Sequence, residues 1–150
     1  MIATSVAYDL LFLIHVVAAV ITVIVFVTMR FAAISVARGA DGATQARRFP
    51  ERRNWAARVM HVLPVTGLIM SLSGGSSVSL ARPWIGVGLL CYLAAAGHLE
   101  VRALPQERMV TATIAREGTA SIEQGRKLVR SIDVLLALIA VALVSMLVQF

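Results

Sequence analysis

Long runs of apolar residues, separated by polar stretches, make up most of the chain. The runs cover residues 8–30, 57–74, 83–102 and 131–150. A helix needs about 20 mostly apolar residues to cross the roughly 30 Å hydrocarbon core of a bilayer. No run shows a sustained alternation of period two, so strands are not expected. The pattern predicts one domain over residues 1–150, an all-α integral membrane protein folded as an antiparallel four-helix bundle.

Local signals indicate where the first three helices begin and end. The first apolar run is followed by "RFAAISVAR", which we expect to continue the helix until the glycines of "GADG" end it. The second run is the shortest, and it carries His61 and Pro64. The third run opens with Pro83, at a first-turn position where proline costs no hydrogen bond.

The polar stretch before the fourth run is itself expected to be helical. The segment "PQERMVTATIAREG" contains helix formers and ends at Gly118. Ser121 and Gln124 then have the spacing of a capping box, in which two side chains satisfy the free N–H groups at a helix start. The fourth helix is therefore predicted to begin near Ser121, ahead of its apolar part.

Basic residues are concentrated in two of the three connections. The connections 39–56 and 103–130 are basic, whereas Arg82 is alone between the second and third runs. Basic loops stay in the cytoplasm, so these two connections are predicted to be cytoplasmic and both termini to lie outside. The basic residues are Arg30, Arg38, Arg47, Arg48, Arg52, Arg53 and Arg58 around the first connection, and Arg102, Arg108, Arg116, Arg126, Lys127 and Arg130 around the third.

The interface aromatics agree with this topology. Tyr8 and Trp84 fall at the predicted outer boundary and Trp55 at the inner one. The first run is longer than the apolar core of a signal peptide, which has about 7–15 residues, and no basic segment precedes it. It is therefore interpreted as an uncleaved span.

The composition argues against a soluble domain and against a nucleic-acid-binding protein. The chain is 59% hydrophobic and 15% charged, against about 45–50% and 25% in soluble domains. The chain has a net charge of +6, and its basic residues lie beside the apolar runs, which favours contact with anionic lipid headgroups. There is no basic face interleaved with aromatics, so nucleic-acid binding is not expected. The single cysteine, Cys91, supports no disulfide framework and is interpreted as a packing residue.

The three histidines are predicted to lie at two depths. At 1.5 Å per residue, His15 is about 10 Å below the outer boundary at Tyr8. His61 and His98 are each within about one turn of an arginine, Arg58 or Arg102, and so belong to the inner leaflet. His15 is then roughly 15–20 Å from the other two, which excludes one three-histidine metal site.

A polar cluster is predicted in the inner leaflet, made of Arg58, His61, His98, Glu100 and Asp133. Polar groups in membrane helices are costly and tend to face a partner, so this layer is a candidate site. His61 and His98 would then ligate a b-type haem or a metal between facing helices. The alternatives are a proton or ion path, or an interfacial layer without chemistry in which Asp133 pairs with Arg130 or Arg58.

His15 is the most deeply placed ionisable residue. It shares a helix face with Ala18, Ala19 and Thr22, a small-residue surface suited to close helix contact. We expect a neutral imidazole that hydrogen-bonds across helices, with Tyr92 as the candidate partner. The alternative is that His15 ligates a haem or pigment.

Three short segments resemble a known family. "LIHVVAAV" in the first run, "PVTGLIMSLSGG" in the second and "ARPWIGVGLLCYLAAA" in the third look like an uncharacterised family of bacterial membrane proteins, domain of unknown function 2269. This resemblance covers nearly the whole chain and implies four helices in the bacterial cytoplasmic (inner) membrane, with no activity attached.

A more distant similarity is to the copper-resistance D and membrane protoporphyrinogen oxidase families. There a first-helix histidine, matched here by His15, is linked to haem or metal. The chain departs from the second of these families because its only lysine, Lys127, lies outside the spans.

The sequence contains no complete catalytic motif. "SGGSS" is a turn without the lysine of a phosphate loop, and neither H-E-x-x-H nor C-x-x-C occurs. The leading interpretation is a small non-enzymatic membrane protein, an accessory or scaffold subunit that binds a membrane-protein partner or a second copy of itself. The alternative is a haem- or metal-binding redox protein using His61 and His98, or His15 alone.

Overall fold

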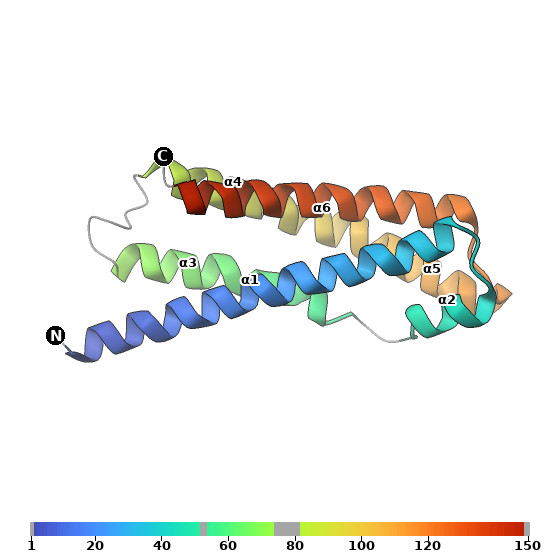
Figure 1. Ribbon diagram of the computed structural model, residues 1–150, viewed down its shortest axis with the longest axis horizontal. Helices are drawn as coiled ribbons and strands as arrows, with labels where there is room; N and C mark the ends of the chain where they lie inside the picture. The colour runs from blue at the N-terminus through green and yellow to red at the C-terminus, as the bar shows by residue number, and fades with distance from the viewer. Residues whose placement is uncertain (1, 52–53, 74–81, 149–150) are drawn as a thin grey trace.

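A computed structural model of the chain describes residues 2–51, 54–73 and 82–148 (Figure 1). Within these residues all regular structure is helical, which confirms the all-α class. The elements are α1 (Ile2–Ala37), α2 (Gly42–Arg48), a 3₁₀ helix η1 (Ala56–His61), α3 (Val62–Ser73), α4 (Pro83–His98), a π-helical turn η3 (Leu99–Ala103), α5 (Leu104–Glu117) and α6 (Ile122–Val148).

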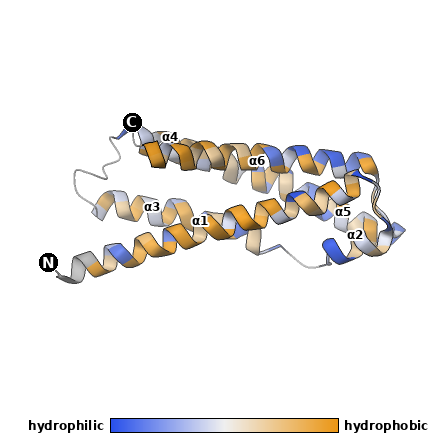
Figure 2. Ribbon diagram, viewed as in Figure 1, coloured by the Kyte–Doolittle hydropathy of each residue, from blue (hydrophilic) through white to orange (hydrophobic). Residues whose placement is uncertain are grey.

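Four helical stretches of the described residues are long and apolar enough to cross a membrane. They are Val6–Ala37, Ala56–Ser73, Pro83–Glu117 and Ile122–Val148. Each contains most of one predicted apolar run, so the expectation of four apolar helices is confirmed. Figure 2 shows that apolar residues follow the length of α1, α3 and α4 and the later part of α6.

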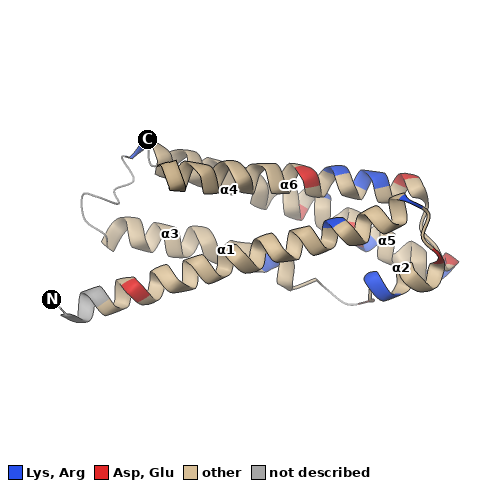
Figure 3. Ribbon diagram, viewed as in Figure 1, with Lys and Arg blue, Asp and Glu red and all other residues tan. Residues whose placement is uncertain are grey.

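The long helices lie alongside one another, and both ends of the chain lie at the same end of the molecule (Figure 1). α1 packs against α6 and α3, and α4 packs against α6. The short helix α2 lies at the opposite end, where it packs against α5 and α1. Lys and Arg gather at this same end (Figure 3).

The predicted helix ends are confirmed at three points. α1 ends at Ala37, just before Gly39, which has a φ of 73°. α5 ends at Glu117 and is followed by Gly118 with a φ of 80°, a left-handed conformation that glycine adopts without strain. The capping box is formed in both directions: the N–H of Ser121 donates to Gln124 Oε1 at 2.8 Å, and the N–H of Gln124 donates to Ser121 Oγ at 3.2 Å.

The helix α2 is a difference from the sequence prediction, which expected only a break at "GADG". Asp41 is the N-cap of this helix and accepts hydrogen bonds from the N–H of Thr44 at 2.9 Å and its hydroxyl at 2.7 Å. These hydrogen bonds, the hydroxyl's above all, hold the pKa of Asp41 below its ordinary value. The connection therefore folds back on the bundle instead of running as a loop.

The third helical stretch continues past residue 102, where the apolar run ends. Pro105 has no N–H to donate, and the chain passes this point through the π-helical turn Leu99–Ala103 before α5 begins. Pro64 is handled differently, because α3 starts at Val62 and proline is tolerated in a first turn. The preceding residues Ala56–His61 form a 3₁₀ helix.

The packed core lies toward the basic end of the molecule. Phe26, Met60, Leu99 and Leu128 are completely buried in it. α1 and α6 come into backbone contact there, since a Cβ at Gly125 would lie 2.4 Å from the backbone nitrogen of Ala37. At the other end α1, α3, α4 and α6 line a partly open cavity.

Candidate functional site

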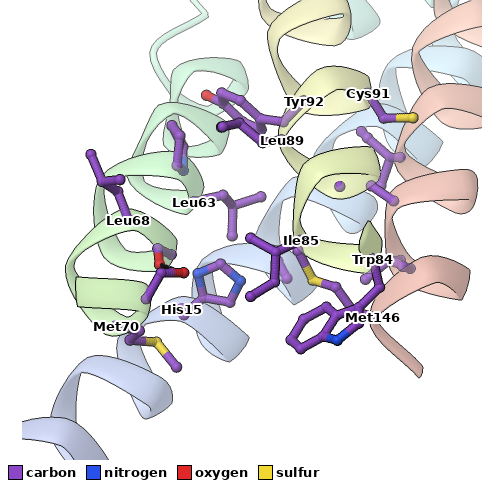
Figure 4. A pocket seen from close by; sticks show the side chains of 18 of the residues that line it. His15, Leu63, Leu68, Met70, Trp84, Ile85, Leu89, Cys91, Tyr92 and Met146 are labelled. Atoms are coloured by element: carbon purple, nitrogen blue, oxygen red, sulfur yellow. Dashed lines mark hydrogen bonds between the residues drawn. The ribbon is translucent and has the colours of Figure 1, made fainter. Parts of the chain in front are cut away.

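The cavity has a volume of about 410 Å³ and is lined by α1, α3, α4 and α6. Its walls are mainly apolar, with Phe12, Leu138 and Met146 among them, and Trp84 and Tyr92 add aromatic rings. The side chain of His15 lies among these groups (Figure 4). A volume in the range of about 300–1,000 Å³ is typical of small-molecule sites in proteins.

His15 is held by Thr66 of α3. The His15 Nδ1 atom lies 2.7 Å from Thr66 Oγ1, and the same hydroxyl lies 2.8 Å from the carbonyl oxygen of Val62. A hydroxyl has a single hydrogen, and here it is donated to that carbonyl. The Thr66 oxygen therefore accepts a hydrogen bond from Nδ1–H of His15. This tautomer leaves an unprotonated nitrogen at Nε2.

The expected interhelical hydrogen bond of His15 thus exists, but the predicted partner Tyr92 is wrong. The Tyr92 hydroxyl lies 3.1 Å from His61 Nδ1 instead. Sequence reasoning did not single out Thr66, although a hydroxyl residue in an apolar helix was a usable signal. Which helix supplies the partner depends on the rotation of α1 about its axis, and α1 is apolar all round.

The predicted inner-leaflet cluster separates into three groups in the structure. The first contains Arg58, Glu100, His61 and Tyr92. Arg58 donates from two nitrogens to the two carboxylate oxygens of Glu100, at 2.9 and 3.0 Å. His61 Nε2 lies 3.4 Å from Glu100 Oε1, so a chain of polar contacts runs from Arg58 to the Tyr92 hydroxyl at the cavity wall.

His98 belongs to the second group, which it forms with Ser131 of α6. Its Nε2 lies 2.9 Å from the Ser131 hydroxyl oxygen and 3.1 Å from the carbonyl oxygen of the same residue. The side chain therefore joins α4 to α6. His61, by comparison, contacts only groups on α4 and the π-helical turn through its two nitrogens.

Asp133 forms the third group with Arg30 of α1. Arg30 Nε donates to Asp133 Oδ1 at 2.5 Å. The expected partners of Asp133, Arg130 and Arg58, are therefore wrong. Arg58 is engaged by Glu100 and also lies over the ring of Trp55, 5.2 Å from its centroid.

The residues fit a haem or metal unequally. Both ring nitrogens of His61 contact protein groups, and Nε2 of His98 contacts Ser131, so this pair does not present two free nitrogens to one haem. His15 fits better, because its Nδ1–H is bonded to a hydroxyl and Nε2 has no hydrogen-bond partner among the described residues. In the described part of the chain, no three His, Cys, Asp or Glu side chains come close enough to hold a metal ion.

A second, polar cavity of about 510 Å³ lies near the basic end. Arg58, Glu107, Arg108 and Arg116 contribute to its lining. Asn54 donates to Glu107 Oε1 at 2.8 Å and so ties the segment before η1 to α5. The charges in this cavity are of both signs, which does not select one class of ligand.

A scan against protein-family models, a search of curated proteins and a search of solved structures each find no match for this chain. The resemblances drawn from its short apolar segments therefore remain predictions.

Proposed function

We propose that the chain is an integral protein of the bacterial inner membrane, an antiparallel bundle of four spans with both termini outside. The clustering of Lys and Arg at one end of the molecule supports this orientation (Figure 3). Side chains exposed along the apolar helices are large and apolar, Phe12, Leu90 and Leu147 among them, as lipid contact requires. The basic end would face the cytoplasm and the anionic headgroups of that leaflet.

Within the membrane, the proposed role is that of a non-enzymatic accessory or scaffold subunit. One observation carries this proposal: two ion pairs between charged side chains join helical segments of the chain to one another. Arg30 and Asp133 join α1 to α6, and Arg58 and Glu100 join η1 to the π-helical turn. Such pairs hold the helices at fixed positions, so that a rigid apolar face is presented to a partner.

A photo-crosslinking experiment in native membranes tests this role. A crosslinking amino acid at Leu13, which is 58% exposed on α1, is expected to capture a membrane protein or a second copy of the chain. The same amino acid at Ala18, which is 4% exposed on the same helix, is the matched control and is expected to react only within the chain. Lipid adducts alone at Leu13 would contradict the scaffold role.

A second candidate function is a redox protein with haem or metal at His15. The observation that favours it is the Nε2 atom of His15, which has no partner among the described residues and borders a cavity. A haem bound there would supply electron transfer. An optical spectrum of the purified protein decides this candidate: a Soret band that His15→Ala abolishes supports it, and a colourless protein that contains no metal contradicts it.

A further inference from the structure

The apolar cavity contains a strong hydrogen-bond acceptor for which the described residues supply no partner. His15 Nδ1 is occupied by Thr66, whereas Nε2 has no hydrogen-bond partner among the described residues (Figure 4). Two other polar side chains at the wall, those of Tyr92 and Ser71, are engaged within the protein. Tyr92 contacts His61, and the Ser71 hydroxyl donates to the carbonyl of Gly67 at 2.9 Å. A ligand in the cavity would therefore find a strong acceptor, Nε2 of His15, in mainly apolar surroundings.

Gly67 keeps space open beside this acceptor. A Cβ at this position would lie 3.5 Å from Cε1 of His15, the carbon between the two ring nitrogens. A larger side chain would therefore cover the edge of the imidazole that faces the cavity. Gly67 also belongs to the cavity wall, so its lack of a side chain enlarges the space available to a ligand.

We propose that this cavity binds a neutral, apolar molecule with a single hydroxyl group, whose hydrogen is donated to Nε2 of His15. An uncharged hydrocarbon body matches the walls formed by Phe12, Leu138 and Met146. The hydroxyl matches this acceptor, which otherwise loses its hydrogen bonds to water without replacement. Charged molecules are disfavoured, because none of the described residues that line the cavity is an Asp, Glu, Lys or Arg.

This inference depends on the proposed membrane role, since the ligand would reach the cavity from the bilayer. The chain contains two tryptophans, and Trp84 lies in the cavity wall. In a Trp55→Phe background, Trp84 is the only tryptophan and reports contact with a brominated probe by quenching. The probes are 8-bromo-1-octanol and its methyl ether, which differ only in the hydroxyl hydrogen, added to phosphatidylcholine nanodiscs that contain the protein.

The two probes distribute differently in the bilayer itself. For each variant we therefore take the ratio of the values measured with the two probes, and this ratio is compared between variants. The ratio of half-quenching mole fractions, ether over alcohol, is expected to be about fivefold higher in the parent than in His15→Phe, as one neutral hydrogen bond provides. Gly67→Val is expected to weaken quenching by both probes. Gly97→Val is the matched control, because Gly97 has open space around it and does not line the cavity.

An equal ratio in the parent and in His15→Phe overturns the inference. So does a Soret band in the isolated protein, because Nε2 would then be a haem ligand. A chain that does not enter nanodiscs overturns the proposed membrane role and the inference together, whereas entry with an unchanged ratio overturns the inference alone.

Discussion

Arg30 on α1 and Asp133 on α6 form an ion pair across 103 residues of sequence. Both side chains are partly exposed, at 38% and 45%. They lie at the level where the apolar part of α6 begins, next in sequence to the core residues Met29 and Ile132. The pair therefore fixes how far α1 and α6 are displaced along one another.

The first prediction concerns the energy of this pair. Arg30→Gln and Asp133→Asn are each expected to destabilise the protein, and the double variant is expected to cost less than the two together. The coupling energy should be at most about 1 kcal/mol, because the pair is partly exposed. Denaturation of the detergent-solubilised protein with SDS measures the four stabilities. As control, Arg130→Gln should show no coupling to Asp133→Asn, and coupling there in place of Arg30 would contradict the structure.

The second prediction concerns the close approach of α1 and α6. Gly125→Ala places a Cβ against the backbone of Ala37 and Val36, so one helix must move and the protein should lose about 1–3 kcal/mol. Gly97→Ala is the matched control, because a Cβ there meets nothing within 4 Å and alanine favours the helix by up to about 1 kcal/mol. The same SDS titration measures both. Equal stabilities for the two variants would rule out the close contact.

The four apolar helices and several helix ends were predictable because their signals are local. Hydropathy shows the four apolar runs, and the spacing of Ser121 and Gln124 shows the start of α6. The helix α2 carried a local signal too, since Asp41 precedes Thr44 at N-cap spacing, but the glycines on each side were interpreted only as a break. Helix ends can therefore be predicted from the local sequence, provided that each possible capping residue is considered.

The pairing of polar side chains was not predictable in the same way. Asp133 pairs with Arg30, and His15 pairs with Thr66. Both partners are determined by the rotation of each helix about its axis. α1 is apolar on every face, so no periodic pattern indicates which face meets α3 or α6. The position of a residue along its helix is available from the sequence, whereas the direction of its side chain requires the packed structure.

The third prediction concerns Gln45, which is 1% exposed in α2. Its amide nitrogen donates to the carbonyl of Ala40 at 2.8 Å, and its amide oxygen accepts from the N–H of Ala120 at 2.8 Å. Gln45→Ala leaves both backbone groups without these bonds and is expected to cost about 1–3 kcal/mol. Hydrogen exchange at the amide of Ala120 should accelerate. Arg47→Ala, at an exposed position of the same helix, is the control. Unchanged slow exchange at the amide of Ala120 in Gln45→Ala would contradict the hydrogen bond between Ala120 and Gln45.

The fourth prediction concerns pH. Because Thr44 lowers the pKa of Asp41 in the folded protein, the cap stabilises α2 above the ordinary aspartate pKa and loses this effect as the pH falls through the folded value. Carboxyl carbon NMR of labelled Asp41 should show a pKa below the ordinary aspartate value. Thr44→Val should raise the Asp41 value. A value for Asp41 that Thr44→Val leaves unchanged would show that the cap does not form.

The central claim is that the basic connections lie in the cytoplasm. Single cysteines at Ala43, Ser73 and Thr119, all exposed positions, test it in a Cys91→Ala background. With a membrane-impermeant maleimide, intact cells should label only Ser73→Cys, and Ala43→Cys and Thr119→Cys should react only after the membrane is opened. Labelling of Ala43→Cys or Thr119→Cys in intact cells, with Ser73→Cys protected, would contradict the account.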